Sequence, residues 1–231
     1  MLLFLVSNIS AQSKSNTENV KEIFEKVKNN YETKNFYSFN IKYQLFKSAN
    51  ATVVEEFYTG KIIKNEAKYY SKINNTEFIQ IEDIHLKINH DEKAMLYLKQ
   101  PVSSYNSLIE LASFLKFFEQ TNIELKQDTY VCELVSKNIT VLPYSKVIVY
   151  IDAKTYCINK QVLFLLNQQN FEDDKGNIIA SNPRLEIIFS PVNHNPISGE
   201  KFVLSKYVSL IDGNIKPSKH LKGYQIINTT L

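Results

Sequence analysis

A period of two dominates the residue pattern from Phe36 to Gln100. In the stretch FYSFNIKYQLFK, Phe39, Ile41 and Tyr43 fall on one face of an extended chain, and polar side chains fall on the other. Further short runs of the same kind follow, separated by turns that contain Asn, Asp or Glu. Strands at such close spacing can be joined only by hairpins, so the sequence predicts an antiparallel sheet.

More runs with this period lie between Thr129 and Thr230, after a break at Pro101. No linker rich in Pro, Gly or Ser and no fixed repeat interrupts the chain, so we expect residues 12–231 to form a single domain. So many strands in one sheet cannot stay flat. We therefore predict an α+β fold, in which a large curved antiparallel sheet forms an incomplete barrel covered by two or more helices.

Two stretches have helical spacing. Ser15 and Glu18 match a capping box at the start of the first, which has a single apolar face. The second is expected from about Ser104 to Glu119 and is apolar on two sides. Its main apolar stripe consists of Leu108, Leu111, Phe114, Leu115 and Phe118. Ile109 and Phe117 lie on the side that should face water, which predicts a second contact for this helix besides the sheet.

The stretch MLLFLVSNISAQ predicts export. Leu2–Val6 is a short apolar run, and Ser10 and Ala11 are small residues ahead of an expected cleavage before Gln12. The run is too short to span a bilayer, and no Cys follows it that could carry a lipid. We expect residues 1–11 to be an export signal that lacks its basic beginning, on a soluble periplasmic protein. An apolar, disordered N-terminus is the alternative.

Cys132 and Cys157 could pair in an oxidising compartment. We place them on strands that are separated by a third strand, Ser145 to Asp152, which would hold them roughly 10 Å apart. A disulfide needs Cα atoms within about 7 Å of each other, so the sequence predicts two buried free thiols.

The residue pattern nominates no chemical site. The net charge of +3 is small and no basic cluster is present, which argues against nucleic acid. His85 and His90 are five residues apart and would point to opposite faces of a strand, so we expect no metal site. No Ser lies in a nucleophile motif, neither Cys has a basic neighbour, and no carboxylate pair stands out. We expect neither an enzyme nor a cofactor.

The order of these elements resembles the periplasmic outer-membrane lipoprotein carrier family (LolA-like). The resemblance covers about Asn19 to Phe202. NVKEIFEKVKNNYETKNFYSFNIKYQL resembles the opening helix and first strand of the family, and VIVYIDAKTYCINKQVLFL resembles its strand-turn-strand. FVL, at 202–204, lies where the family has a late Phe-containing strand. The chain departs from the family in having Lys64 and no Arg in KIIKNEAKYY, and in a longer tail at 212–231.

The resemblance implies a half-barrel of the LolA/LolB type that holds the acyl chains of lipoproteins or lipids. It implies inner- and outer-membrane lipoprotein-sorting proteins as further partners, and we expect a monomer. The second helix would then be a lid that meets lipid. The residues expected to line the cavity and lid are Phe39, Ile41, Tyr43, Leu108, Ile109, Leu111, Phe114, Leu115, Phe117 and Phe118. An envelope sensor on the same fold, without lipid cargo, is the alternative function.

Overall fold

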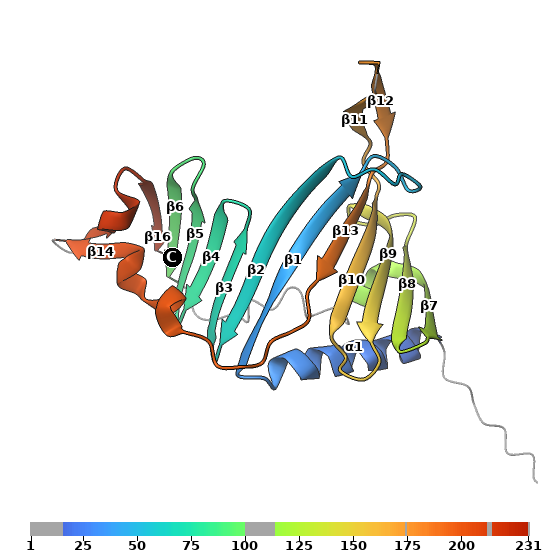
Figure 1. Cartoon of the computed structure of the whole chain (residues 1–231), viewed down its shortest axis with the longest axis horizontal. Coiled ribbons are helices and arrows are strands. Elements are labelled where there is room, and N and C mark those ends of the chain that lie inside the picture. The colour runs from blue at the N-terminus through green and yellow to red at the C-terminus, as the bar shows by residue number, and fades with distance from the viewer. Residues whose placement is uncertain (1–15, 100–113, 174, 212–213, 231) are drawn as a thin grey trace, which may run out of the picture.

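The computed structural model describes residues 16–99, 114–173, 175–211 and 214–230 (Figure 1). Its largest element is one curved sheet of 12 strands. From edge to edge, the strands are β16 (Gln225–Thr230), β6 (Ala94–Lys99), β5 (Ile84–Asn89), β4 (Thr76–Ile81), β3 (Lys68–Ile73), β2 (Glu56–Asn65), β1 (Phe36–Phe46), β13 (Arg184–Phe189), β10 (Ile158–Leu165), β9 (Tyr144–Asp152), β8 (Thr129–Ser136) and β7 (Phe118–Lys126). In the described part of the chain, β16 and β7 are the two edges, so the sheet does not close into a barrel.

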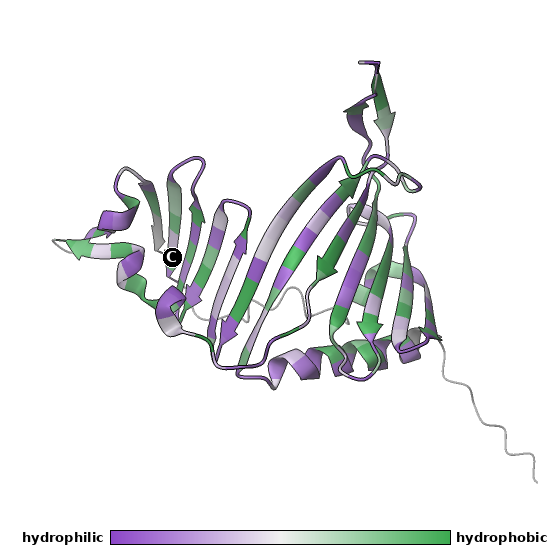
Figure 2. Ribbon diagram, in the orientation of Figure 1, coloured by the Kyte–Doolittle hydropathy of each residue, from purple (hydrophilic) through white to green (hydrophobic). Residues whose placement is uncertain are grey.

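Hairpins join β1 to β6 in sequence, as the alternating pattern predicts. Figure 2 shows apolar and polar residues alternating along β1. The antiparallel prediction is confirmed for every neighbouring pair in the described sheet except one. β16 runs parallel to β6, with Gln225 opposite Ala94. A parallel pair cannot be closed by a hairpin, and the chain between 100 and 224 makes this connection.

The helix α1 (Asn16–Glu32) covers one half of the sheet, from β1 to β7; we call the face that it covers the inner face (Figure 1). Its buried side consists of Val20, Ile23, Phe24, Val27 and Tyr31. These side chains pack against apolar residues of β1, β8 and β9, such as Phe39, Cys132 and Val149. The predicted first helix, with its single apolar face, is confirmed.

The other half of the sheet is covered on the opposite face. The chain after β13 forms η2 (Gly199–Phe202), η3 (Leu204–Lys206), the hairpin of β14 (Val208–Ile211) and β15 (Asn214–Pro217), and η4 (Lys219–Leu221). Its buried residues are Phe202, Tyr207, Val208 and Leu221. They form a second core with the row Ile63, Tyr70 and Ile79, which are cross-strand neighbours.

The two cores lie on opposite faces of one sheet. Phe39, under α1, is opposite Ile62 in the register of β1 and β2, whereas the second core uses the adjacent residue, Ile63. Adjacent residues of a strand point to opposite faces. We call the face under 197–224 the outer face. A small hairpin of β11 (Gln169–Glu172) and β12 (Ile178–Ser181) projects beyond the sheet between β10 and β13 (Figure 1).

The prediction of two or more helices is wrong for the described residues, which contain one α-helix. Most of the second predicted helix, at 104–113, lies outside the described residues. Its last part forms a short 3-10 turn, η1 (Leu115–Phe117), and Phe118 then begins β7. The apolar spacing suits a helix, but the backbone from Phe118 pairs with β8 instead, where Phe118 lies opposite Ser136. The expected export signal at 1–11 also lies outside the described residues.

Candidate functional site

The residues predicted from the first strand lie on the inner face of β1. Phe39 and Ile41 are 6% and 2% exposed and form part of the core under α1. The Phe39 ring is stacked on Tyr37, with centres 5.8 Å apart, and also meets Phe189 at 5.8 Å. Tyr43 is half-buried at the border of this core. Of these three predicted residues, Tyr43 is the one with substantial exposed surface.

The predicted lid is only partly described. Leu108, Ile109 and Leu111 lie outside the described residues. Leu115 and Phe118 are buried in the core under α1, and Phe117 packs half-buried against it. Phe114 is 37% exposed, and its ring lies 6.3 Å from the Phe117 ring.

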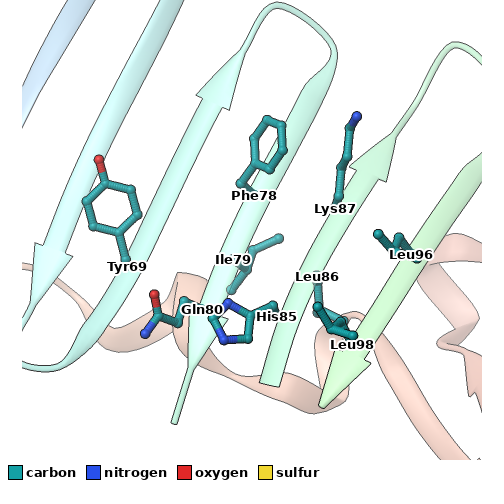
Figure 3. A pocket seen from close by; sticks show the side chains of 9 residues that line it. All are labelled: Tyr69, Phe78, Ile79, Gln80, His85, Leu86, Lys87, Leu96 and Leu98. Atoms are coloured by element: carbon teal, nitrogen blue, oxygen red, sulfur yellow. The ribbon is translucent and has the colours of Figure 1, made fainter. Parts of the chain in front are cut away.

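A hollow lies on the strands of the half that carries the second core, and Figure 3 shows its lining. It has a volume of about 150 Å³. Its lining comes from β3 to β6 and consists of Tyr69, Phe78, Ile79, Gln80, His85, Leu86, Lys87, Leu96 and Leu98. Sequence reasoning missed this set of residues.

Strand register explains why the side chains of this lining other than Ile79 and Leu86, which point into the second core, gather on one face. Phe78 lies opposite Lys87, which lies opposite Leu96. In a neighbouring row, Tyr69, Gln80, His85 and Leu98 follow one another across the four strands. Both rows are on the inner face, since Tyr69 pairs across β2 and β3 with Lys64, which pairs with Tyr37 under α1. We call this site the inner hollow.

One strand of the inner hollow, β6, is apolar on both faces. In β6, Met95 and Tyr97 are buried in the second core, while Leu96 and Leu98 line the inner hollow. This doubled apolar pattern is visible in the stretch AMLYLK and is the signal that could have identified the site. A strand with one covered face and one wet face would alternate with polar residues instead.

The lining of the inner hollow includes four side chains with polar groups, which are Tyr69, Gln80, His85 and Lys87. Gln80 is 6% exposed, and burial lowers the pKa of His85, which favours the neutral imidazole. Burial raises the pKa of Tyr69 well above its ordinary value. Lys87 is the one charged residue in the lining, and its Nζ lies 5.6 Å from the centre of the Phe78 ring. The lining thus offers apolar surface, neutral hydrogen-bonding groups and one cation.

Lys64 lies in KIIKNEAKYY, near the end of β2. Its Nζ donates hydrogen bonds to the backbone oxygens of Tyr31, Glu32 and Lys34, at 3.3, 3.1 and 2.8 Å. Burial lowers the pKa of Lys64, and its Nζ lies 5.6 Å from the centre of the Tyr37 ring. Lys64 therefore ties the end of α1 to β2, on the inner face beside Tyr69.

The cysteines are both free, as predicted. β9 separates the strand of Cys132 from β10, which begins just after Cys157. Cys132 is buried, and burial raises the pKa of its thiol to about 12. Cys157 is only half-buried, contrary to prediction, because it lies in the turn before β10. Its Sγ accepts a hydrogen bond from Asn30 Nδ2 at 3.4 Å.

The described residues offer neither a cluster of metal ligands nor a membrane-spanning helix. Residues 16–99, 114–173, 175–211 and 214–230 contain no group of three or more His, Cys, Asp or Glu side chains placed to hold a metal ion. His85 faces the inner hollow, whereas His90 lies 3.2 Å from Glu77 and 2.9 Å from the Tyr224 hydroxyl. None of the described helices is long and apolar enough to cross a membrane.

No protein-family model and no curated protein matches the chain. Among solved structures, the chain is similar to an uncharacterized conserved protein from Thermus thermophilus, with a TM-score of 0.50 and 8% identity over 91% of this chain and 99% of that one. This likeness shows a shared fold.

Two further matches have lower scores. A LolA superfamily protein from Nitrosomonas europaea matches with a TM-score of 0.34 and 13% identity, over 79% of this chain and 96% of that one. The lipoprotein LppX from Mycobacterium tuberculosis matches with a TM-score of 0.35 and 8% identity, over 77% of this chain and 99% of that one. The first of these two proteins bears the name of the family that the sequence resembles.

Proposed function

We propose that the protein is a periplasmic binding protein or carrier that holds an acyl chain of a lipid or lipoprotein in the inner hollow. The observation that carries this proposal is the apolar lining on β3 to β6, on a face that α1 leaves free. Phe78, Leu96 and Leu98 are only half-buried there, although each is a large apolar side chain. Binding of an apolar ligand is favourable here, because it removes this apolar surface from water.

The size of the inner hollow limits its cargo. Its volume of about 150 Å³ lies below the roughly 300–1,000 Å³ typical of sites for drug-sized ligands. An apolar cavity of roughly this size holds a molecule such as benzene. The site therefore suits a segment of one acyl chain, with the rest of the ligand outside it.

The polar groups give this ligand an orientation. Gln80 and His85 are cross-strand neighbours and can donate hydrogen bonds to an ester or amide oxygen at the head of an acyl chain. A neutral imidazole and an amide suit an uncharged group. Lys87 lies in the row of Phe78 and Leu96, and its ammonium group can bind an acidic headgroup. These are binding groups, and the proposal includes no reaction and no cofactor.

Binding of a fluorescent fatty acid tests the proposal. Phe78→Asn should weaken its affinity by about 10- to 100-fold, because burying a Phe side chain is worth roughly 1.5–3 kcal/mol. Phe57→Asn is the matched control, since Phe57 is 64% exposed on β2 and does not line the inner hollow. Equal affinities for the two variants would reject the inner hollow as the site.

The alternative is an envelope sensor or interaction module on the same fold. The small volume of the inner hollow and the burial of Phe39 and Ile41 in a filled core favour it. Organic extraction of the purified protein, followed by mass spectrometry of the extract, separates the two functions. A carrier should release lipid, and a protein that is repeatedly empty favours the sensor. In either case we propose a monomer that works with lipoprotein-sorting proteins of the two membranes.

A further inference from the structure

A second and larger hollow lies on the outer face, at the centre of the sheet. Its volume is about 590 Å³, and it lies where β13, β1, β2 and β3 adjoin. The residues that matter for its chemistry are Asn40, Lys42, Thr59, Lys61, Lys72 and Asn74. We call this site the lysine hollow. No carboxylate is among its lining residues.

The register of the sheet places like charges together in the lysine hollow. Lys61 on β2 lies directly opposite Lys72 on β3. Lys42 on β1 lies opposite Thr59, which makes it the diagonal neighbour of Lys61. Side chains directly opposite on neighbouring strands have Cβ atoms about 4.5–5.5 Å apart, and like charges at that separation destabilise a sheet.

Of the three lysines, only Lys72 forms an ion pair with a described carboxylate. Lys72 Nζ lies 3.5 Å from Glu77 Oε1, but the same oxygen is 3.2 Å from His90 Nε2. Lys61 makes no ion pair with any described residue, and Lys42 lies with its Nζ 5.9 Å from the centre of the Phe57 ring. Lys42 and Lys61 thus lie on neighbouring strands in a hollow whose lining includes no carboxylate.

The neutral groups of the lysine hollow are hydrogen-bond donors. Asn40 lies on β1, Thr59 on β2 and Asn74 in the turn after β3, and each side chain can donate to an oxygen. Lysines that act as point charges, together with amide and hydroxyl donors, are a common way to hold a phosphate group. The volume lies within the range of small-molecule sites and exceeds the needs of a bare anion.

We propose that the lysine hollow binds a phosphate group carried by an organic molecule, either a soluble phosphate ester or a phospholipid headgroup. Lys61, together with its diagonal neighbour Lys42, is then a binding group, because a bound phosphate neutralises these two charges. This site is on the face opposite the inner hollow. It stands whether or not the inner hollow holds an acyl chain.

Calorimetric titration with glycerol 3-phosphate and flotation with phosphatidylglycerol vesicles test the proposal and separate its two sources. Binding of glycerol 3-phosphate without vesicle binding assigns a soluble ester. Vesicle binding alone assigns a lipid headgroup. In either case Lys61→Gln should weaken binding at least tenfold, whereas Lys21→Gln, on the exposed side of α1, should leave it unchanged. Failure of both probes to bind wild-type protein, or equal binding by wild type and Lys61→Gln, would overturn the proposal.

Thermal unfolding gives a readout that does not depend on the choice of ligand. Without ligand, Lys61→Gln should unfold at a higher temperature than wild type, because the substitution removes the repulsion from Lys72. Glycerol 3-phosphate or vesicles should raise the melting temperature of wild type and leave that of Lys61→Gln nearly unchanged. A variant that melts below wild type would show that Lys61 stabilises the sheet, which contradicts a site built for an external anion.

Discussion

Lys64 Nζ donates a hydrogen bond to the backbone oxygen of Tyr31, 33 positions earlier in the chain, at 3.3 Å. The last backbone carbonyls of a helix have no partner within the helix. A cation near these carbonyls is stabilising, because they carry the negative end of the helix dipole. Lys64 thus fastens the end of α1 to the sheet at the border between the covered and free parts of the inner face.

Replacement of Lys64 should loosen this fastening. We expect Lys64→Met to lower the free energy of unfolding by about 1–2 kcal/mol, since it removes charged hydrogen bonds and a favourable interaction with the helix dipole. Urea unfolding followed by circular dichroism measures the change. Lys34→Met is the control, because the Lys34 side chain is exposed. A loss of the same size in both variants would contradict a specific role for Lys64.

Substitutions in the described part of the predicted lid should differ in their effect on stability, according to whether the side chain is buried or exposed. Leu115 is 9% exposed, so Leu115→Ala should cost roughly 2–5 kcal/mol. Phe114 is 37% exposed, so Phe114→Ser should cost well under the ~3–5 kcal/mol of a truncated core Phe. Thermal melting of the two variants side by side checks this order. Equal losses would place Phe114 in a core as well.

The two thiols should differ in reactivity. Burial raises the pKa of Cys132 to about 12, so its thiolate is scarce at neutral pH and the thiol is out of reach of reagents. In the folded protein, we expect a thiol reagent to modify Cys157 alone. After unfolding without reductant, both cysteines should react. No reaction in the unfolded protein would mean a disulfide, contrary to the structure.

Alkaline pH should destabilise the protein through its buried tyrosines. Burial raises the pKa of Tyr31, Tyr37 and Tyr69 above their ordinary value, which the unfolded chain keeps at about 10. Their contribution is fully present below the unfolded pKa and is lost as the pH rises toward the folded pKa. We expect the urea midpoint to be constant from about pH 8 to 9 and to fall above about pH 10. A midpoint that is unchanged at pH 11 would contradict this prediction.

The sequence predicted the strands of the first half well, because local hairpins and a period of two leave little choice of register. FYSFNIKYQLFK and AMLYLK correspond closely to β1 and β6. The pattern could not say which face a distant segment covers. In β6 both Tyr97 and Leu98 are apolar, and only the return of the chain at 197–224 decides that Tyr97 is in a core and that Leu98 lines the inner hollow.

The end of the predicted second helix shows a different limit. Residues from Leu115 to Phe118 have apolar side chains at helical spacing, yet the chain turns at η1 and enters β7. A short apolar run fits a helix or a buried strand equally well by its spacing. The deciding interaction is backbone pairing with β8, which residue pattern alone does not specify.

The seam between β1 and β13 has a consequence for synthesis of the chain. Backbone and side-chain groups that meet there, such as Asn40 and Ser190, are 150 positions apart. As a nascent chain emerges, β1 to β6 can form from local hairpins. The edge of β1 that does not pair with β2 stays unpaired until β13 has been synthesised. An unpaired edge is a template for pairing with other molecules. During that interval the growing chain is exposed to aggregation, so a chaperone that shields β1 until residue 189 has emerged would protect its yield.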